Sequence, residues 1–146
     1  AAGCFLLSLM GGATVGSIST PVIFIGAFLF AYTMVGAPLD ESFDVKEDER
    51  YGCKTLAMVL SWRKIISLMI FFTLVIMTLT PLTYRQLGFN TLFPIIMVGS
   101  CGISLSLLFS LLSRAEKGPE SLSKLELGSL YICWVMMQVA PVLGSL

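Results

Sequence analysis

Residues 65–82 read Ile65-Ile-Ser-Leu-Met-Ile-Phe-Phe-Thr-Leu-Val-Ile-Met-Thr-Leu-Thr-Pro-Leu82, a run without a single charged side chain. A helix of this length rises about 27 Å, close to the roughly 30 Å of hydrocarbon in a bilayer. Similar apolar runs lie at about residues 1–17, 20–37, 92–112 and 127–144. Lipid offers no partner to unpaired backbone groups, and no two-residue alternation is visible, so each run predicts a helix. We therefore expect an all-α integral membrane helical bundle with about five transmembrane helices, forming a single membrane domain over residues 1–146.

The overall composition supports a membrane location. Hydrophobic residues make up 56% of the 146 positions and charged residues 12%, and the mean hydropathy is +0.91. These values exclude an ordinary soluble domain. The chain contains no histidine, and its four cysteines, at positions 4, 53, 101 and 133, show no C-x-x-C spacing. A zinc site, a disulfide framework and histidine-based catalysis are therefore not indicated.

The charged residues divide the predicted loops into two groups. Five of the nine basic residues lie in the 38–64 loop, three in the 113–126 loop and one, Arg85, in the 83–91 loop. Alternating helices place the first two loops on the same side, and an excess of Lys and Arg marks the cytoplasmic side. All acidic residues lie in those two loops as well. We therefore predict an integral protein of the cell membrane whose active site faces the cytoplasm.

The most informative polar segment is residues 40–55, which read DESFDVKEDERYGCKT. Its three aspartates are spaced four residues apart: Asp40, Asp44 and Asp48. On a helix, a four-residue step advances about 6 Å and turns only about 40°, so these carboxylates form one stripe. Three neighbouring like charges repel one another, which suggests a bound cation. Gly52 stands where a helix C-cap is expected, and Lys54-Thr55 adds a cation and a hydroxyl beside the stripe.

Two interpretations of this segment are open. The 38–64 segment could be a solvated connecting loop in which Asp44 pairs with Lys46 or Arg50. Alternatively, it binds a phosphorylated ligand through Mg²⁺, an ion that takes one or two carboxylates and completes its octahedron with phosphate oxygens and water. Lys or Arg would then contact the remaining phosphate charge. No register of the segment gives the oxygen-ligand pattern of an EF-hand.

The pattern Asp44-x-x-x-Asp48-x-x-x-Gly52-x-Lys54-Thr55-Leu56-Ala57 resembles the second aspartate-rich motif of the UbiA superfamily of intramembrane prenyltransferases. The layout is similar too, since the motif ends one membrane helix and is followed by a short cap segment and three more spans. The charged 113–126 loop resembles that of archaeal members, and the chain is nearest in look to geranylgeranylglyceryl phosphate geranylgeranyltransferases. The resemblance implies a nine-helix fold, of which this chain is the C-terminal portion, with 38–64 as the cytoplasmic aspartate-rich motif and cap loop.

The resemblance also implies an enzymatic activity. Such an enzyme transfers a prenyl group, with Mg²⁺, from a long-chain isoprenyl diphosphate to a lipid, quinone-precursor or similar acceptor within the membrane. The implied metal ligands are Asp44 and Asp48, together with Asp40 or Glu41 as the upstream carboxylate. The implied catalytic residues are Asp44, Asp48 and Lys54. The implied substrate-binding residues are Lys54, Arg50, Lys46 and Thr55.

The chain also departs from the family pattern. The first motif of the family, N-D-x-x-D-x-x-x-D, does not occur in the 146 residues, so the resemblance implies a partner, the N-terminal half of the same fold. The turn at 35–38 lacks the polar pair of many relatives. One alternative is a non-catalytic half-length relative that binds prenyl diphosphate or a partner subunit. Another, a small transporter or channel that uses the acidic stripe as a cation site, is disfavoured because no acidic or basic residue lies at mid-membrane depth. We expect no nucleic-acid partner.

Overall fold

The computed structural model describes residues 20–52 and 54–146, together with Leu6, Met10 and Ala13. The long helices are α2 (Thr20–Arg50), α4 (Trp62–Thr83), α5 (Leu92–Ser113) and α6 (Lys124–Gly144). A short helix, α3 (Leu56–Val59), follows α2, and two 3₁₀ turns, η1 (Ala115–Lys117) and η2 (Pro119–Ser121), connect α5 to α6. No strand occurs among the described residues, as the all-α prediction requires.

Four segments are long and apolar enough to cross a membrane: Val22–Arg50, Trp62–Thr83, Leu92–Ser113 and Lys124–Gly144. They correspond to the predicted runs 20–37, 65–82, 92–112 and 127–144. The predicted run 1–17 lies outside the described residues, apart from the three isolated helical positions. The prediction of an integral membrane helical bundle is confirmed, with four candidate spans in the described part of the chain.

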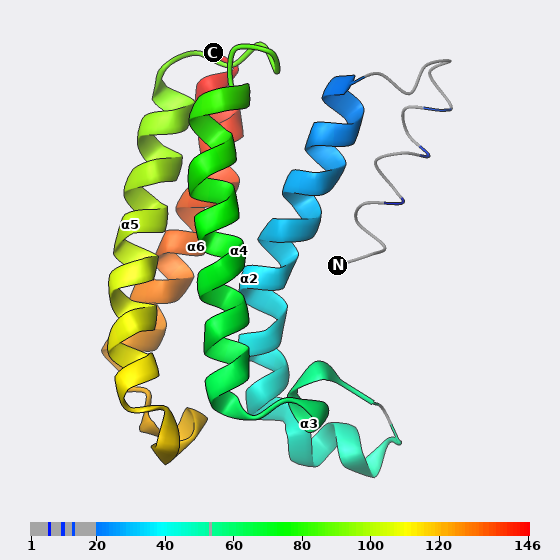
Figure 1. The fold of residues 1–146 in the computed structure, drawn as a ribbon, viewed down its shortest axis with the longest axis vertical. Helices are drawn as coiled ribbons and strands as arrows, with labels where there is room; N and C mark the ends of the chain where they lie inside the picture. The colour runs from blue at the N-terminus through cyan, green and yellow to red at the C-terminus, as the bar shows by residue number, and fades with distance from the viewer. Residues whose placement is uncertain (1–5, 7–9, 11–12, 14–19, 53) are drawn as a thin grey trace.

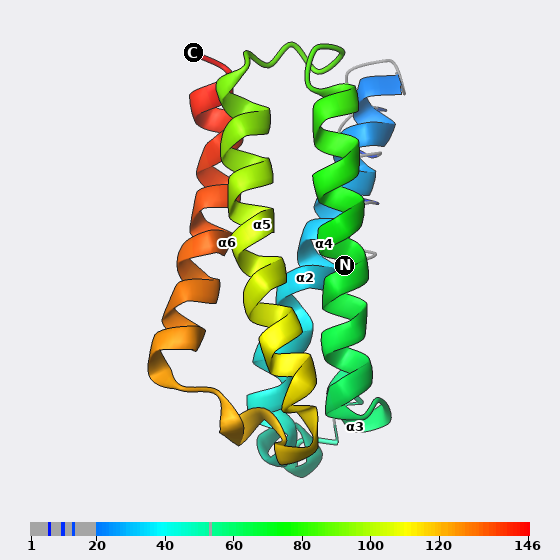
Figure 2. The same cartoon turned by 60° about the vertical axis from the view of Figure 1, so that its left-hand side comes forward.

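The long helices pack in chain order, with α2 beside α4, α4 beside α5, and α5 beside α6 (Figure 1, Figure 2). Buried side chains between them form two clusters. The cluster nearer to α3 includes Leu39, Ile66, Met69 and Leu108. The cluster nearer to the other end includes Val35, Phe93, Met97 and Met137. Close packing of these clusters fixes how the helices lie against one another.

Helix α2 has 31 residues and joins the predicted apolar run 20–37 to the predicted helical stripe of aspartates. It passes through Pro38, although proline commonly ends a helix, and continues to Arg50. Proline removes one backbone hydrogen bond, the one its missing N–H would donate to the Met34 carbonyl. Leu39 is completely buried in the core, and this packing outweighs the lost bond. Gly52 then turns the chain with a φ of +68°, as its predicted C-cap role requires.

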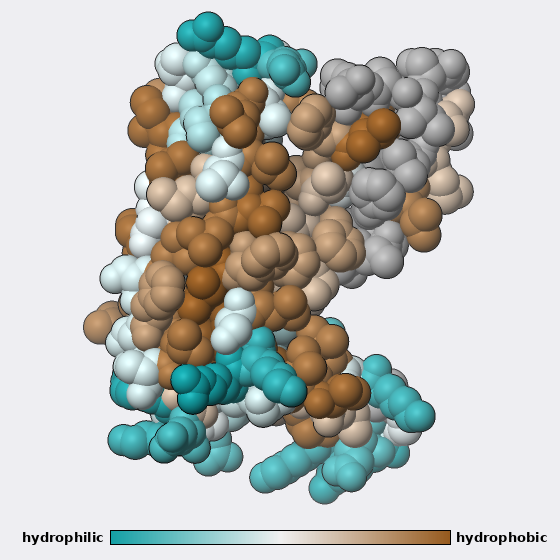
Figure 3. All heavy atoms as spheres, in the orientation of Figure 1, coloured by the Kyte–Doolittle hydropathy of each residue, from teal (hydrophilic) through white to brown (hydrophobic). Residues whose placement is uncertain are grey.

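The surface of the bundle is apolar along the spans and polar at both ends (Figure 3). Large apolar side chains are exposed along the spans, among them Phe71, Ile95, Ile103, Ile132 and Val142. Exposed apolar area of this extent suits contact with hydrocarbon. The segments around α3 and around η1 and η2 lie at one end of the bundle, and the connection between α4 and α5 lies at the other (Figure 1, Figure 2). This is the grouping of loops that the sequence predicts.

Helix α2 approaches α6 closely at Gly36. A Cβ atom added there would lie 2.4 Å from Cζ2 and 2.5 Å from Cη2 of Trp134. One turn earlier, the Tyr32 hydroxyl donates a hydrogen bond to the Trp134 carbonyl at 3.4 Å. The missing side chain at Gly36 therefore lets α2 contact a helix that is not its neighbour in the packing order, as small residues commonly do in membrane bundles.

We expect Gly36→Ala to lower the free energy of unfolding by about 1–3 kcal/mol, the usual cost of overpacking a close contact. Unfolding of the purified protein in detergent, followed by circular dichroism, measures this change. Gly99→Ala in α5 is the matched control, because a Cβ atom there meets no described heavy atom within 4 Å. Equal stability of the two variants would contradict a packing role for Gly36.

Candidate functional site

The three aspartates predicted to form a stripe all lie on the last part of α2. Asp40 and Asp44 are exposed, and Asp48 is half-buried. At four-residue spacing they project from nearly the same side of the helix. The same row continues toward the middle of the span through Gly36 and Tyr32, which contact α6. We call Asp40, Asp44 and Asp48 the aspartate stripe; it runs from the contact with α6 to the charged end of the bundle.

Asp44 and Asp48 have no side-chain hydrogen bond or ion pair with any described residue. No ion pair involves α2 in the described part of the chain, so Asp44 pairs with neither Lys46 nor Arg50. The charge pairs that the loop interpretation predicts are therefore absent from the described part of the chain. Two neighbouring carboxylates without a cation repel each other, which favours binding of a metal ion or a cationic group.

Asp40 is contacted from α6. The Tyr131 hydroxyl donates a hydrogen bond to Asp40 Oδ1 at 2.5 Å, and the Tyr131 ring packs edge-on against Trp134. The sequence does not reveal this contact. An aromatic residue near the end of a span is typically an interfacial anchor, and no local pattern pairs Tyr131 with Asp40.

Glu41, the other predicted upstream carboxylate, binds backbone. Its Oε2 accepts a hydrogen bond from the Leu56 N–H at 3.0 Å. Leu56 is the first residue of α3, where backbone N–H groups have no partner within the helix. Glu41 therefore ties the start of α3 to α2 and constrains the turn between them.

Lys54 and Thr55 lie in the connection from Gly52 to α3. Lys54 is exposed. Thr55 is the N-cap residue of α3, but its side chain makes no capping hydrogen bond. The Thr55 Oγ1 atom is buried and has no hydrogen-bond partner in the described structure. Leaving a buried hydroxyl unpaired costs about 1–3 kcal/mol, so a ligand oxygen that paired with it would gain that energy.

Lys46 and Arg50 project away from the aspartate stripe. Each follows an aspartate by two residues, which is a turn of about 200° on a helix. Lys46 lines a hollow of about 390 Å³ at the charged end of the bundle, together with side chains such as Phe43, Trp62 and Glu120. The structure therefore does not bring these two predicted diphosphate contacts together with the stripe.

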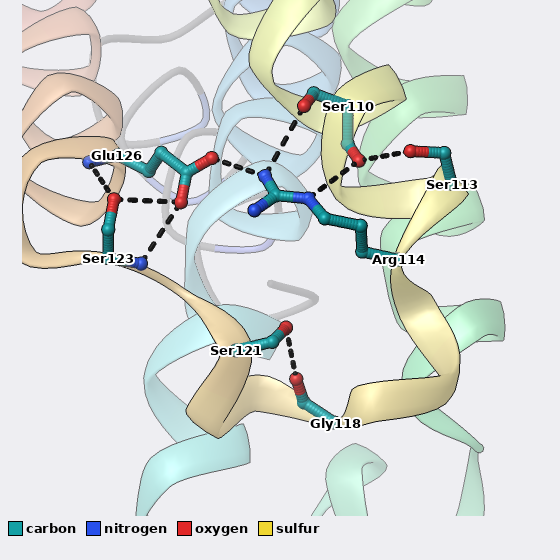
Figure 4. A network of polar contacts seen from close by, with 7 residues as sticks. All are labelled: Ser110, Ser113, Arg114, Gly118, Ser121, Ser123 and Glu126. Atoms are coloured by element: carbon teal, nitrogen blue, oxygen red, sulfur yellow. Dashed lines mark hydrogen bonds and ion pairs between the residues drawn. The ribbon is translucent and has the colours of Figure 1, made fainter.

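A polar network joins the end of α5 to the start of α6 (Figure 4). Arg114 forms an ion pair with Glu126, and its Nε donates to the Ser110 carbonyl at 3.4 Å. Glu126 accepts from the Ser123 N–H at 3.0 Å, and Ser123 Oγ accepts from the Glu126 N–H at 3.2 Å. These reciprocal bonds form a capping box, which starts α6 at Lys124, three residues before the predicted run. The charges of Arg114 and Glu126 thus serve the fold of this connection.

The oxygen donors of the stripe fit a magnesium ion that is shared with a phosphorylated ligand. Asp44 and Asp48 supply two carboxylates one helical turn apart, and Mg²⁺ usually takes one or two carboxylates together with phosphate oxygens and water. Within the described residues, no three His, Cys, Asp or Glu side chains are placed to hold a metal ion by themselves. The arrangement therefore suits an ion whose remaining ligands come from elsewhere.

The sequence was compared with models of known protein families. Residues 1–130 match the model of the UbiA prenyltransferase family. The chain belongs to this family. The UbiA match covers all of α2 with the aspartate stripe, α3, α4, α5 and the first turns of α6. No curated protein and no solved structure matches the chain.

Proposed function

We propose that the protein transfers a prenyl group, with Mg²⁺, from a long-chain isoprenyl diphosphate to a lipid, quinone-precursor or similar acceptor within the membrane. The observation that carries this proposal is the pair Asp44 and Asp48, which lie unpaired among the described residues on a chain of the UbiA family. Two carboxylates attract a diphosphate only through a cation, and Mg²⁺ is the hard cation that combines carboxylate and phosphate oxygens.

The roles of the individual residues follow from this chemistry. Mg²⁺, when bound, neutralises the negative charge that develops on the departing diphosphate. Asp44 and Asp48 hold and orient the ion at the charged end of the bundle. Lys54 contacts the remaining phosphate charge, and the unpaired Thr55 Oγ1 donates a hydrogen bond to a phosphate oxygen. The apolar spans keep water away from the allylic carbon, so that the acceptor attacks it instead.

Of the three predicted cations, we propose Lys54 as the main diphosphate contact. Lys46 and Arg50 leave α2 from the side opposite the stripe. Lys54 lies beyond the Gly52 turn, outside α2, so the geometry of that helix does not fix the direction of its side chain.

We also propose an orientation and a partner. The excess of Lys and Arg at the charged end supports a cytoplasmic location for that end, in the cell membrane. A diphosphate carries up to about three negative charges, and Asp44 and Asp48 add one each. One Mg²⁺ and one lysine do not neutralise this total. An N-terminal half of the same fold, carrying the first aspartate-rich motif, would supply the second set of ligands and face the stripe.

The direct test is transfer of a radiolabelled geranylgeranyl group to a panel of lipid and quinone-precursor acceptors by membranes that contain the chain and the proposed N-terminal half. We expect a labelled lipid product with Mg²⁺, loss of that product with EDTA, and recovery when excess Mg²⁺ is added. Binding of geranylgeranyl diphosphate without any product across the panel would contradict catalysis and support the non-catalytic relative.

A further inference from the structure

We propose that Tyr131 is a positioning residue for the aspartate stripe. Its hydrogen bond to Asp40 fixes the direction of α2 beyond Pro38 and thereby places Asp44 and Asp48. We call this bond the Tyr131–Asp40 clasp. The inference rests on the proposed function of the Asp44–Asp48 pair, and it assigns Asp40 to the support of the site instead of to the metal.

Helix α2 has a weak point just before the stripe. Pro38 has no N–H, so the Met34 carbonyl receives no hydrogen bond from it, and helices bend most readily at such positions. The Ser42 hydroxyl donates to the Pro38 carbonyl at 2.6 Å, which competes with the backbone for that acceptor. Asp44 and Asp48 both lie beyond this weak point, so a bend there would move them together.

Three consecutive residues fasten α2 immediately beyond Pro38, each in a different direction. Leu39 is buried in the cluster formed with α4 and α5. Glu41 binds the start of α3 through the Leu56 N–H. Asp40 binds Tyr131 of α6. Of the three contacts, the clasp is the one that acts on the face of α2 that carries the stripe.

The Tyr131 hydroxyl is itself held in place. The rings of Tyr131 and Trp134 form an edge-on pair with centroids 5.5 Å apart. Trp134 is in turn wedged against α2, because its ring occupies the space of the missing Gly36 side chain and its carbonyl accepts the Tyr32 hydroxyl. The contact of Trp134 with α2 therefore holds the Tyr131 hydroxyl in position before it binds Asp40. Because little freedom is lost when this hydrogen bond forms, it can set the separation of α2 and α6.

Substitutions at Asp40 separate a clasp from a metal ligand. An asparagine oxygen still accepts a hydrogen bond from a tyrosine hydroxyl, but it replaces a carboxylate poorly at a hard cation. Asp40→Asn therefore preserves the clasp, whereas Asp40→Ala and Tyr131→Phe break it. If Asp40 were a ligand of the ion, Asp40→Asn would be as damaging as Asp44→Asn.

The first measurement is the distance between spin labels on α2 and α6. Labels are placed at Glu47→Cys and Leu125→Cys, which are exposed positions, in a chain with Cys4→Ser and Cys53→Ser. Cys101 and Cys133 remain, since they are buried and will not react. We expect narrow distance distributions for the wild type and Asp40→Asn, and distributions about twice as wide for Tyr131→Phe and Asp40→Ala, as expected of a freed helix end. The double variant Tyr131→Phe/Asp40→Ala should be no wider than either single variant.

The second measurement is binding of Mn²⁺, used in place of Mg²⁺ and followed by electron paramagnetic resonance. Tyr131→Phe and Asp40→Ala should weaken binding about 10-fold, the usual effect of removing a supporting residue, and Asp40→Asn should weaken it less than either. Tyr51→Phe is the matched control, because Tyr51 is exposed near the same end of α2 and should change neither measurement.

Two results would overturn the proposal. One is an unchanged distance distribution in Tyr131→Phe, and the other is a loss of Mn²⁺ binding in Asp40→Asn equal to that in Asp44→Asn. Failure of the proposed function would look different. The wild-type chain would bind no Mn²⁺, alone or with the proposed N-terminal half, while the distance distributions would still support or overturn the clasp.

Discussion

Replacing Asp44 or Asp48 by asparagine, in the chain co-expressed with the proposed N-terminal half, is expected to lower Mg²⁺-dependent prenyl transfer by about 100-fold or more, the size of effect seen when one preorganised electrostatic contact to developing charge is lost. Each substitution removes a negative charge that a neutral amide oxygen replaces poorly at a hard cation. Neither side chain makes a hydrogen bond or an ion pair in the described structure, so neither substitution breaks such a contact in the fold. The rate of transfer by purified protein, measured beside its unfolding curve, separates lost activity from lost structure.

The matched control for these variants is Glu49→Gln. Glu49 is an exposed acid on the same helix, but it follows Asp48 by one residue and therefore points about 100° away from the stripe. The substitution removes the same charge without removing a proposed ligand, and transfer should change little. Equal losses in Glu49→Gln, Asp44→Asn and Asp48→Asn would mean that the charge of the whole segment matters, and the assignment of two specific ligands would fail.

Most of the membrane helices could be predicted from hydropathy alone. The apolar runs 65–82 and 92–112 anticipate α4 (Trp62–Thr83) and α5 (Leu92–Ser113) to within three residues, because lipid leaves an apolar segment no alternative to a helix. Hydropathy alone does not place the end of α2, because the apolar run stops at residue 37. The end of this helix follows instead from the four-residue spacing of the aspartates and from Gly52 after them. The burial of Leu39 against distant helices, which supports the helix through Pro38, is contained in no local pattern.

The features of the candidate site also fall into two groups, those that local sequence predicts and those that depend on tertiary packing. The stripe follows from four-residue spacing on one helix, and the Gly52 turn follows from its place after the helix. The same helical geometry turns Lys46 and Arg50 away from the aspartates, and their role as diphosphate contacts stays a prediction. The contacts of Asp40 with Tyr131 and of Glu41 with Leu56 depend on how α2 meets α6 and α3. That register is set by tertiary packing, for which the sequence alone carries no local signal.

The 146-residue chain by itself is expected to show no transfer of a prenyl group, whereas co-expression with an N-terminal half that carries the first aspartate-rich motif should give transfer dependent on Mg²⁺. The reason is electrostatic. Ionisation of an allylic diphosphate requires that the charge on the leaving group is neutralised and that water is excluded. Asp44 and Asp48 can share one ion with the diphosphate, and Lys54 adds one positive charge, so most of the negative charge of the leaving group stays uncompensated.

The assay compares purified chain, purified chain with the N-terminal half, and the same pair with Asp44→Asn, each incubated with geranylgeranyl diphosphate, Mg²⁺ and the acceptor panel. Transfer should appear in the second sample alone, because the second set of carboxylates must face the stripe across the bound diphosphate. Binding of Mn²⁺ by the purified chain shows in parallel that its half of the site is folded. Strong transfer by the chain alone would contradict the proposal that the chain carries only half of the site. It would mean that a second copy of the chain supplies the charge neutralisation that two carboxylates and one lysine do not provide.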